Sequence, residues 1–454
     1  MKIDIEELTF QGQDGRDDFS REQIADKVIT LITSGIDISP MIINGDWGTG
    51  KSEFCHKLIN KFKSEHYNYK IVYIDAFQAD HADNPLMTIL SAVMGLIENS
   101  RQKSKLLKKS LPVARMVMQT VAKAAVAHTL KQNSDVIAEE FSKVINDSAN
   151  SAIDNTIKAV LKDHEKAKEN LKALKNTLSE ISSNKPIAIF IDELDRCRPD
   201  FAIQMIETIK HTFDVENVFF VLITNTAQLK AAIKHRYGSD VNAQRYLDKF
   251  IKFSFTLPTF VPKHQLHVYD SIHASSQYFT DLISQRDLLK LTILAQKDAQ
   301  PSLYTQELIK RNQLSLREAE LLIRNLEVYQ ALTSKIPDNP TVIGKSMLII
   351  TAVYISCFEL TVSESILNDK SDGTVIFKLI SGKENFNPNT PIPQLQNYEK
   401  FGFLVSKDCK MNKLMYTPKV EWDGIRFDYF NQQVPDAMAE IKKVLLALKL
   451  APHP

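Results

Sequence analysis

The sequence predicts an α/β fold in which a parallel sheet is interrupted by a large helical insertion and followed by a mostly helical C-terminal region. Apolar runs typical of buried parallel strands occur at 41–43, 71–75, 187–191 and 217–223. Between the second and third of these runs, residues 98–184 contain no glycine and a single proline. Apolar residues recur there at helical spacing at Leu171, Leu174, Leu178 and Ile181. We therefore predict a helical insertion over about 98–184.

Length and composition limit the classes of protein to which the chain can belong. Hydrophobic residues make up 44% of the 454 residues, so the chain can form about three domains with their own cores. The formal net charge is +1, which neither requires nor excludes a nucleic acid partner. The four cysteines are isolated in the sequence, which argues against a zinc site and favours a reducing compartment. Because the N-terminus lacks a signal-peptide pattern, a cytoplasmic protein is expected.

The most informative motif follows the first apolar run and has the spacing G-x-x-x-x-G-K-[ST]. It consists of Gly45, Asp46, Trp47, Gly48, Thr49, Gly50, Lys51 and Ser52. Backbone amides can close around phosphate oxygens only where no Cβ intervenes, and for this reason the pattern needs glycines. A helix predicted over 53–62 would add free amides and a partial positive charge. The chain is therefore predicted to bind a nucleoside triphosphate, with Lys51 reaching the β- and γ-phosphates and Ser52 coordinating Mg²⁺.

Two acids, Asp192 and Glu193, end the apolar run at 187–191. Open α/β sheets bind their ligands at the carboxyl ends of the strands. Asp192 is predicted to hold Mg²⁺, mostly through water. Glu193 is predicted to polarise the attacking water as a general base. The alternative is a buried strand that simply ends in two solvated acids.

Asn225 follows the apolar run at 217–223. It is the candidate sensor of the γ-phosphate, because its amide group can both donate and accept hydrogen bonds. The alternative is that Asn225 caps a helix predicted over 227–235.

Residues 101–131 carry eight basic side chains and no acidic one. The basic residues are Arg101, Lys103, Lys105, Lys108, Lys109, Arg115, Lys123 and Lys131. One interpretation is a basic amphipathic element that contacts a membrane surface, a nucleic acid backbone or an acidic partner. The alternative is a helix packed on its neighbours with a solvated basic face.

Four motifs, in order, resemble the KAP family of P-loop NTPases, named after kinase-interacting animal proteins and a plasmid-encoded phage-exclusion protein. They lie within residues 15–260 and comprise the phosphate loop with its internal Trp47, 74–77 with 83–86, 190–197, and 246–250 with 257–258. The resemblance implies the additional-strand, catalytic-glutamate type of P-loop sheet, and a cytoplasmic member of bacterial type is expected. Family members often have Asp at the sensor strand, where this chain has Thr224 and Asn225.

The expected domains are a P-loop NTPase domain over 1–260, a helical lid over 261–335 and a C-terminal interaction domain over 336–454. The lid is implied by the resemblance. Within it, 314–324 resembles the family's lid helix, whose early arginine, Arg317 here, would reach the nucleotide. The alternative for this arginine is a surface ion pair one helical turn away, with Glu320.

An arginine finger from a neighbouring subunit is a further expectation for an oligomeric NTPase. The candidates are Arg196, Arg236 and Arg245. For Arg196, the alternative is a structural ion pair with Asp195 or Asp192.

The flanking regions predict individual elements. One helix is expected to begin after Ser20, its predicted N-cap, and to end at Ile32. A second helix is expected over 434–450. The apolar run at 347–358 is shorter than the roughly 20 residues that span a bilayer, so a buried core helix is expected. Residues 402–405 and 413–416 are interpreted as a hairpin.

The expected function is that of a molecular switch or motor that binds and hydrolyses ATP with Mg²⁺. It would be a homo-oligomer coupled to a protein effector and, by resemblance, active in phage defence. ATP is preferred over GTP because no N-K-x-D motif follows the acidic strand. The alternative is a scaffold that binds nucleotide without hydrolysing it and presents the basic insertion to a membrane or nucleic acid.

Overall fold

The computed structural model describes residues 8–11, 17, 19–82, 84–97, 106, 172–265, 268–338, 343–384, 396–411, 427–430 and 436–450. The basic segment 101–131 lies outside these residues except for Leu106. The chain forms two compact units, Met1–Pro258 and Thr259–Pro454.

The first unit contains a five-stranded parallel sheet with the order β2-β3-β4-β1-β5. The strands are β1 (Met41–Asn44), β2 (Lys70–Asp75), β3 (Ile187–Asp192), β4 (Val218–Thr224) and β5 (Phe253–Thr256). The first four confirm the strands predicted from the apolar runs. Because β4 lies between the phosphate-loop strand β1 and the acidic strand β3, the sheet has the additional strand that the resemblance implied.

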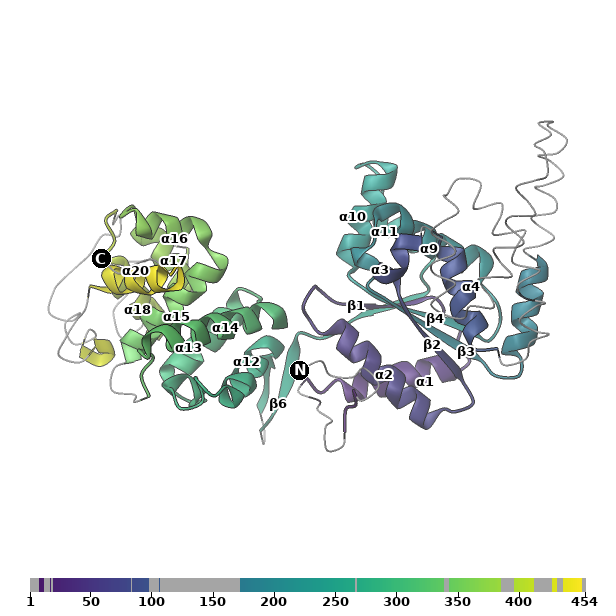
Figure 1. The fold of residues 1–454 in the computed structure, drawn as a ribbon, viewed down its shortest axis with the longest axis horizontal. Coiled ribbons are helices and arrows are strands. Elements are labelled where there is room, and N and C mark those ends of the chain that lie inside the picture. Colours follow the sequence, from purple (N-terminus) through teal and green to yellow (C-terminus); the bar gives the residue numbers. More distant parts are fainter. Residues whose placement is uncertain are drawn as a thin grey trace. The chain divides into compact units, whose positions relative to one another are not determined.

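Helices cover both faces of this sheet (Figure 1). On one face lie α1 (Glu22–Thr33) and α2 (Lys51–Glu65), and on the other lie α4 (Pro85–Gly95) and α9 (Pro199–Thr212). Successive strand residues point to opposite faces, so Ile189 packs with α4 and α9 while Phe190 packs with α1 and α2. Two-sided burial explains why the central strands β1, β3 and β4 are nearly continuous apolar runs.

Further elements complete the first unit. They are α3 (Ala76–Ala79), η2 (Asp80–Ala82), η3 (Leu194–Arg196), α10 (Thr226–Tyr237) and α11 (Ala243–Leu247). Residues 172–182 are helical, and Leu174, Leu178 and Ile181 are buried as their spacing predicted. Residues 98–105 and 107–171 of the predicted insertion lie outside the described residues.

The second unit begins with an antiparallel pair of strands and continues as helices. The strands are β6 (Phe260–Gln265) and β7 (Val268–His273). The helices are α12 (Ala274–Gln285), η4 (Ile293–Ala295), α13 (Gln300–Arg311), α14 (Leu316–Thr333), α15 (Ile343–Phe358), α16 (Leu360–Leu367), α17 (Gly373–Ser381), α18 (Asn397–Ser406) and α20 (Ala437–Leu448). One hydrophobic core joins α12–α14 to α15–α20. The division into a lid over 261–335 and a domain over 336–454 stays a prediction.

The helix predicted over 347–358 is confirmed as α15, which is buried along most of its length. Among the described helices, no single one is long and apolar enough to cross a membrane. Helices α15 and α16 meet that length and composition only as a pair, with a bend of 118° between them.

Two local predictions are wrong. Ser20 does not cap α1, because the Asp17 carboxylate accepts hydrogen bonds from the amides of Arg21 and Glu22 (2.7 and 3.0 Å). Residues 402–405 lie in α18 and not in a hairpin, since a capping box between Gln396 and Glu399 starts a helix there. Residues 413–416 lie outside the described residues.

Candidate functional site

The phosphate loop connects β1 to α2 in a conformation that depends on its glycines. Gly48 and Gly50 have φ angles of +77° and +78°, a left-handed region in which a Cβ is costly. At Gly45, an added Cβ would lie 3.0 Å from Thr49 Oγ1 and 3.1 Å from Lys51 Cγ. The Gly45 amide donates to the Thr224 carbonyl of β4 (3.2 Å), which fixes the start of the loop to the sheet.

Lys51 is the first residue of α2 and is buried. Its ammonium group donates to the Asp46 carbonyl within the loop (3.0 Å). Burial lowers the pKa of Lys51, and the nearby acids Asp195, Asp192 and Glu193, in that order of strength, oppose this lowering. A desolvated cation at a helix N-terminus is well suited to an anionic phosphate chain.

Asp192 and Glu193 lie together at the carboxyl end of β3. Asp192 is 1% exposed, and burial raises its pKa to about 6, against the effect of hydrogen bonds from Ser52 and the Glu193 amide. Glu193 has a left-handed backbone (φ +61°), and its carboxylate accepts a hydrogen bond from Ser52 Oγ (3.0 Å). The structure thus brings Ser52, Asp192 and Glu193 together from α2 and β3.

These side chains fit a Mg²⁺ ion, which prefers hard oxygen ligands and keeps several waters. The Ser52 hydroxyl and the Asp192 carboxylate supply such oxygens beside the phosphate loop. Within the described residues, no group of three or more His, Cys, Asp or Glu is placed to hold a metal by itself. Any Mg²⁺ held here would therefore need nucleotide oxygens and water to complete its coordination.

Arg196 makes an ion pair with Glu193, one turn of η3 away. The alternative prediction of a structural ion pair is therefore right about the pair, but the partner is Glu193 and not Asp195 or Asp192. Because η3 begins directly after Glu193, Arg196 lies three residues along from the glutamate and pairs with it. Glu193 is held from two sides, by Ser52 and by Arg196.

Asn225 caps α10, which confirms the alternative interpretation of this residue. Its Oδ1 accepts from the amides of Ala227 (2.9 Å) and Gln228 (3.4 Å). Its Nδ2 donates to the Asp46 carboxylate of the phosphate loop (3.3 Å). The cap leaves the amide nitrogen directed at the loop, and the γ-phosphate sensor role stays a prediction.

Asp195 lies within the 190–197 motif, but no role in the site was predicted for it. Its carboxylate accepts from the Trp47 indole Nε1 (2.5 Å) and from Thr224 Oγ1 (3.1 Å). The available signal was the third acid in the sequence Asp192-Glu193-Leu194-Asp195. Its partners are distant in sequence, so only the fold identifies them.

Arg317 is the second residue of α14, in the second unit. Its predicted alternative partner, Glu320, accepts a hydrogen bond from the Tyr278 hydroxyl. Ser315 and Glu318 form the capping box that starts α14. The nucleotide-contact role of Arg317 stays a prediction.

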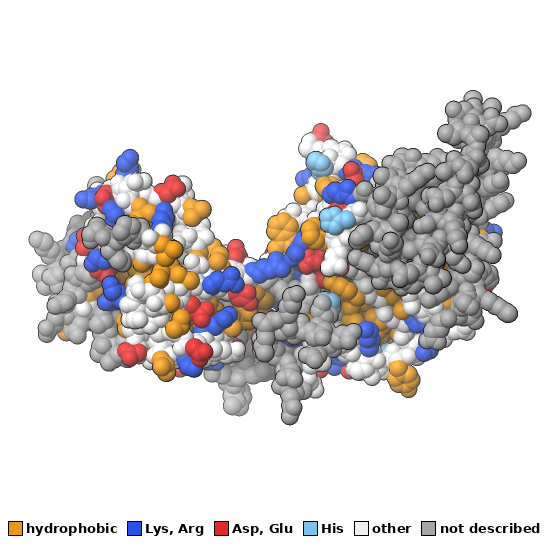
Figure 2. Space-filling model, viewed as in Figure 1, with side chains coloured by type: hydrophobic (Ala, Val, Ile, Leu, Met, Phe, Trp, Pro, Cys, Tyr) orange, Lys and Arg blue, Asp and Glu red, His pale blue; other side chains and the backbone are white. Residues whose placement is uncertain are grey.

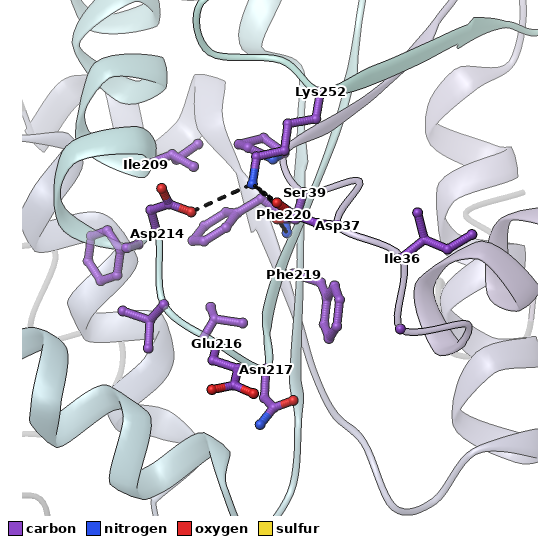
Figure 3. A pocket seen from close by; sticks show the side chains of 15 residues that line it. Ile36, Asp37, Ser39, Ile209, Asp214, Glu216, Asn217, Phe219, Phe220 and Lys252 are labelled. Atoms are coloured by element: carbon purple, nitrogen blue, oxygen red, sulfur yellow. Dashed lines mark hydrogen bonds and ion pairs between the residues drawn. The ribbon is translucent and has the colours of Figure 1, made fainter.

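A separate cavity of about 480 Å³ lies at the amino end of β4 and β5, opposite the phosphate loop. Figure 3 shows Lys252 at this cavity, where its ammonium pairs with Asp37 (2.6 Å) and more distantly with Asp214 (3.9 Å). Phe219 and Glu216 also line it. Nucleotide bound at the phosphate loop would lie at the other edge of the sheet.

This site is that of a P-loop NTPase. A glycine-rich loop connects β1 to α2, two acids lie at the carboxyl end of β3, and β4 lies between these two strands. Nucleotide binding follows from this arrangement. The chain belongs to the KAP family: the KAP family P-loop domain matches residues 21–330. No curated protein matches the chain. Among solved structures, the chain is similar to the Aeropyrum pernix ORC2 protein in its ADPNP-ADP complexes. The match covers 95% of this chain and 95% of the ORC2 chain, with 14% sequence identity. The TM-score of this match is 0.31.

Proposed function

We propose that this protein is an ATPase that acts as a molecular switch or motor. The observation that carries the proposal is the contact between Glu193 and Ser52 Oγ (3.0 Å) beside buried Lys51 and Asp192. A protein that only binds nucleotide has no need of a second acid at this position. Glu193 would take a proton from the attacking water, and a positioned general base contributes about 10²–10⁴-fold to rate.

The remaining residues of the site bind and orient in this proposal. Lys51 would leave the Asp46 carbonyl to neutralise the β- and γ-phosphates. Ser52 and Asp192 would hold Mg²⁺, which supplies charge neutralisation between the β- and γ-phosphates. Asn225, with its amide nitrogen already facing the loop, would contact the γ-phosphate, and Arg317 would do so from the lid. The absence of an N-K-x-D sequence after β3 supports ATP over GTP.

We further propose a homo-oligomer with an arginine finger acting between subunits, coupled to a protein effector. Of the three candidates, Arg196 pairs with Glu193 and Arg236 with Asp200 (3.6 Å) in the same chain. Arg245 on α11 is exposed. We therefore take Arg245 as the preferred candidate for the finger. We also propose a cytoplasmic location, supported by the isolated cysteines, and a role in phage defence, supported by the family resemblance.

Substitutions of Arg245 and Arg196 distinguish an arginine finger from a structural ion pair. Turnover by R245Q should fall about 10³-fold, as expected when a finger is removed. Turnover by R196Q should stay within about tenfold of wild type, because a partly exposed ion pair is worth about 1 kcal/mol or less. Phosphate release at saturating ATP measures both. A loss of 100-fold or more in R196Q, with R245Q active, would reverse the assignment.

The second candidate function is a nucleotide-dependent scaffold that presents its basic insertion. The observation in its favour is the run of eight basic residues without an acid in 101–131. On the face drawn in Figure 2, the described Lys and Arg side chains are instead interspersed with Asp and Glu. In this candidate function, the basic insertion would make the contact with a membrane or nucleic acid.

The test is phosphate release from ATP by the wild-type protein with Mg²⁺, alone and with DNA, RNA or anionic liposomes. We expect Mg²⁺-dependent turnover, slower turnover of GTP, and loss of both binding and turnover in K51A. Stimulation by one additive would identify the surface that the insertion contacts. Tight ATP binding by calorimetry without turnover in any mixture would favour the scaffold.

A further inference from the structure

The Asp195 carboxylate joins three neighbouring strands of the sheet at their carboxyl ends. Asp195 lies in η3, which follows β3. Its Oδ1 accepts from Thr224, the last residue of β4, and its Oδ2 accepts from Trp47, in the loop after β1. The contact therefore crosses over β4 and connects the acidic motif to the phosphate loop.

The three groups around Asp195 are those that a phosphate would also attract. Trp47 presents an N–H donor and Thr224 an O–H donor. Lys51 is a cation, and of the nearby acids Asp195 has the largest effect in raising the pKa of Lys51. Thr224 is fully buried, whereas the Trp47 side chain is 49% exposed. One end of the contact thus lies in the core, and the other end lies at the surface.

A triphosphate at this loop would add several negative charges close to Asp195. Like charges repel strongly at short range in a partly buried site, and phosphate oxygens accept hydrogen bonds as carboxylates do. The same donors cannot serve both acceptors equally well. Binding of the terminal phosphate and the Asp195–Trp47 hydrogen bond should therefore oppose one another.

We propose that Asp195 is a positioning residue that latches the phosphate loop through Trp47 in the nucleotide-free protein and releases it when a nucleoside triphosphate binds. The latch deepens the proposed function, because it rests on nucleotide binding at the same loop. It makes the indole of Trp47 a reporter of the terminal phosphate. It also transmits that state to η3, which carries Arg196 and lies next to Glu193.

Tryptophan fluorescence tests the latch directly, because the chain has two tryptophans, Trp47 and Trp422. In a W422F background, acrylamide quenching reports the solvent access of Trp47. Without nucleotide, D195N should be quenched more strongly than the parent, because an amide offers one acceptor for two donors. D240N, in an exposed turn of the same unit, is the matched control and should quench as the parent does. Subtracting the signal of W47F from wild type gives the same readout if W422F does not fold.

Nucleotide addition tests the second half of the proposal. The emission of Trp47 in the parent should change with a non-hydrolysable triphosphate and change less with the diphosphate. The same additions should leave D195N nearly unchanged, and its triphosphate affinity by calorimetry should rise about tenfold, since a like charge is removed. T224V, which removes the buried donor, should shift the quenching in the same direction as D195N.

The proposal is overturned if D195N quenches as the parent does without nucleotide. It is also overturned if the triphosphate binds by calorimetry and leaves Trp47 emission unchanged, or if di- and triphosphate act equally. If calorimetry shows no nucleotide binding at all, the proposed function fails. The quenching comparison without nucleotide then still decides whether the latch exists.

Discussion

Replacing Glu193 with glutamine should lower the rate of ATP hydrolysis about 10²–10³-fold while leaving nucleotide binding intact. Glutamine keeps an oxygen that can accept from Ser52 Oγ, as the carboxylate does at 3.0 Å. It cannot take a proton from water, so the contribution of a general base is lost. Removing one negative charge near the phosphate chain should also favour binding slightly. Phosphate release and calorimetry with ATP separate the two effects.

The matched control is E216Q, because Glu216 is exposed and lines the cavity at the opposite edge of the sheet. Its turnover should equal that of wild type. If E193Q hydrolyses ATP within about fivefold of wild type, Glu193 is not the base. Glu193 would then be a residue that positions Ser52 and Arg196, the two groups it contacts.

The parts of the site that are local in sequence could be predicted, and those that depend on folding could not. The spacing of Gly45 to Ser52 determines a loop geometry directly, since Gly48 and Gly50 both adopt positive φ. The apolar run ending in Asp192 likewise predicted a buried strand with its acid at the ligand edge. Each of these inferences used residues within one element.

Asp195 and Arg196 show where sequence reasoning stops. The partners of Asp195 are 148 and 29 positions away, in Trp47 and Thr224. For Arg196, an ion pair with Asp195 or Asp192 was the alternative to a finger role, but the pair that forms is with Glu193. The first contact depends on the order of the strands in the sheet and the second on how the chain turns after β3, and residue spacing predicts neither.

Replacing Asp192 with asparagine should stabilise the nucleotide-free, metal-free protein at pH 7.5 by about 2–3 kcal/mol. Folding raises the pKa of Asp192 from 3.8 to about 6, mainly through burial. A tenfold change in proton affinity between the unfolded and the folded chain corresponds to about 1.4 kcal/mol. The carboxylate is ionised at pH 7.5 in both the folded and the unfolded chain, so the full cost of burying its charge is present there. Asparagine fills the same space without charge, and its oxygen can still accept from the Glu193 amide, now 2.8 Å from the Asp192 oxygen.

The sign of the pH dependence follows from the raised pKa. The stability that protonated Asp192 contributes is present below about pH 4 and is lost as the pH rises through about 6. The advantage of D192N in chemical denaturation with EDTA should therefore be full at pH 7.5, smaller at pH 5 and absent below pH 4. D240N should show no such profile, because Asp240 is exposed.

In wild type, Mg²⁺ with ATP should restore stability by pairing the buried charge, and in D192N this gain should be lost. A variant less stable than wild type at pH 7.5, or a gain in stability independent of pH, would contradict this prediction. Either result would mean that Ser52 and Lys51 already compensate the buried charge of Asp192, so that a cation bound there has no unfavourable burial energy to offset.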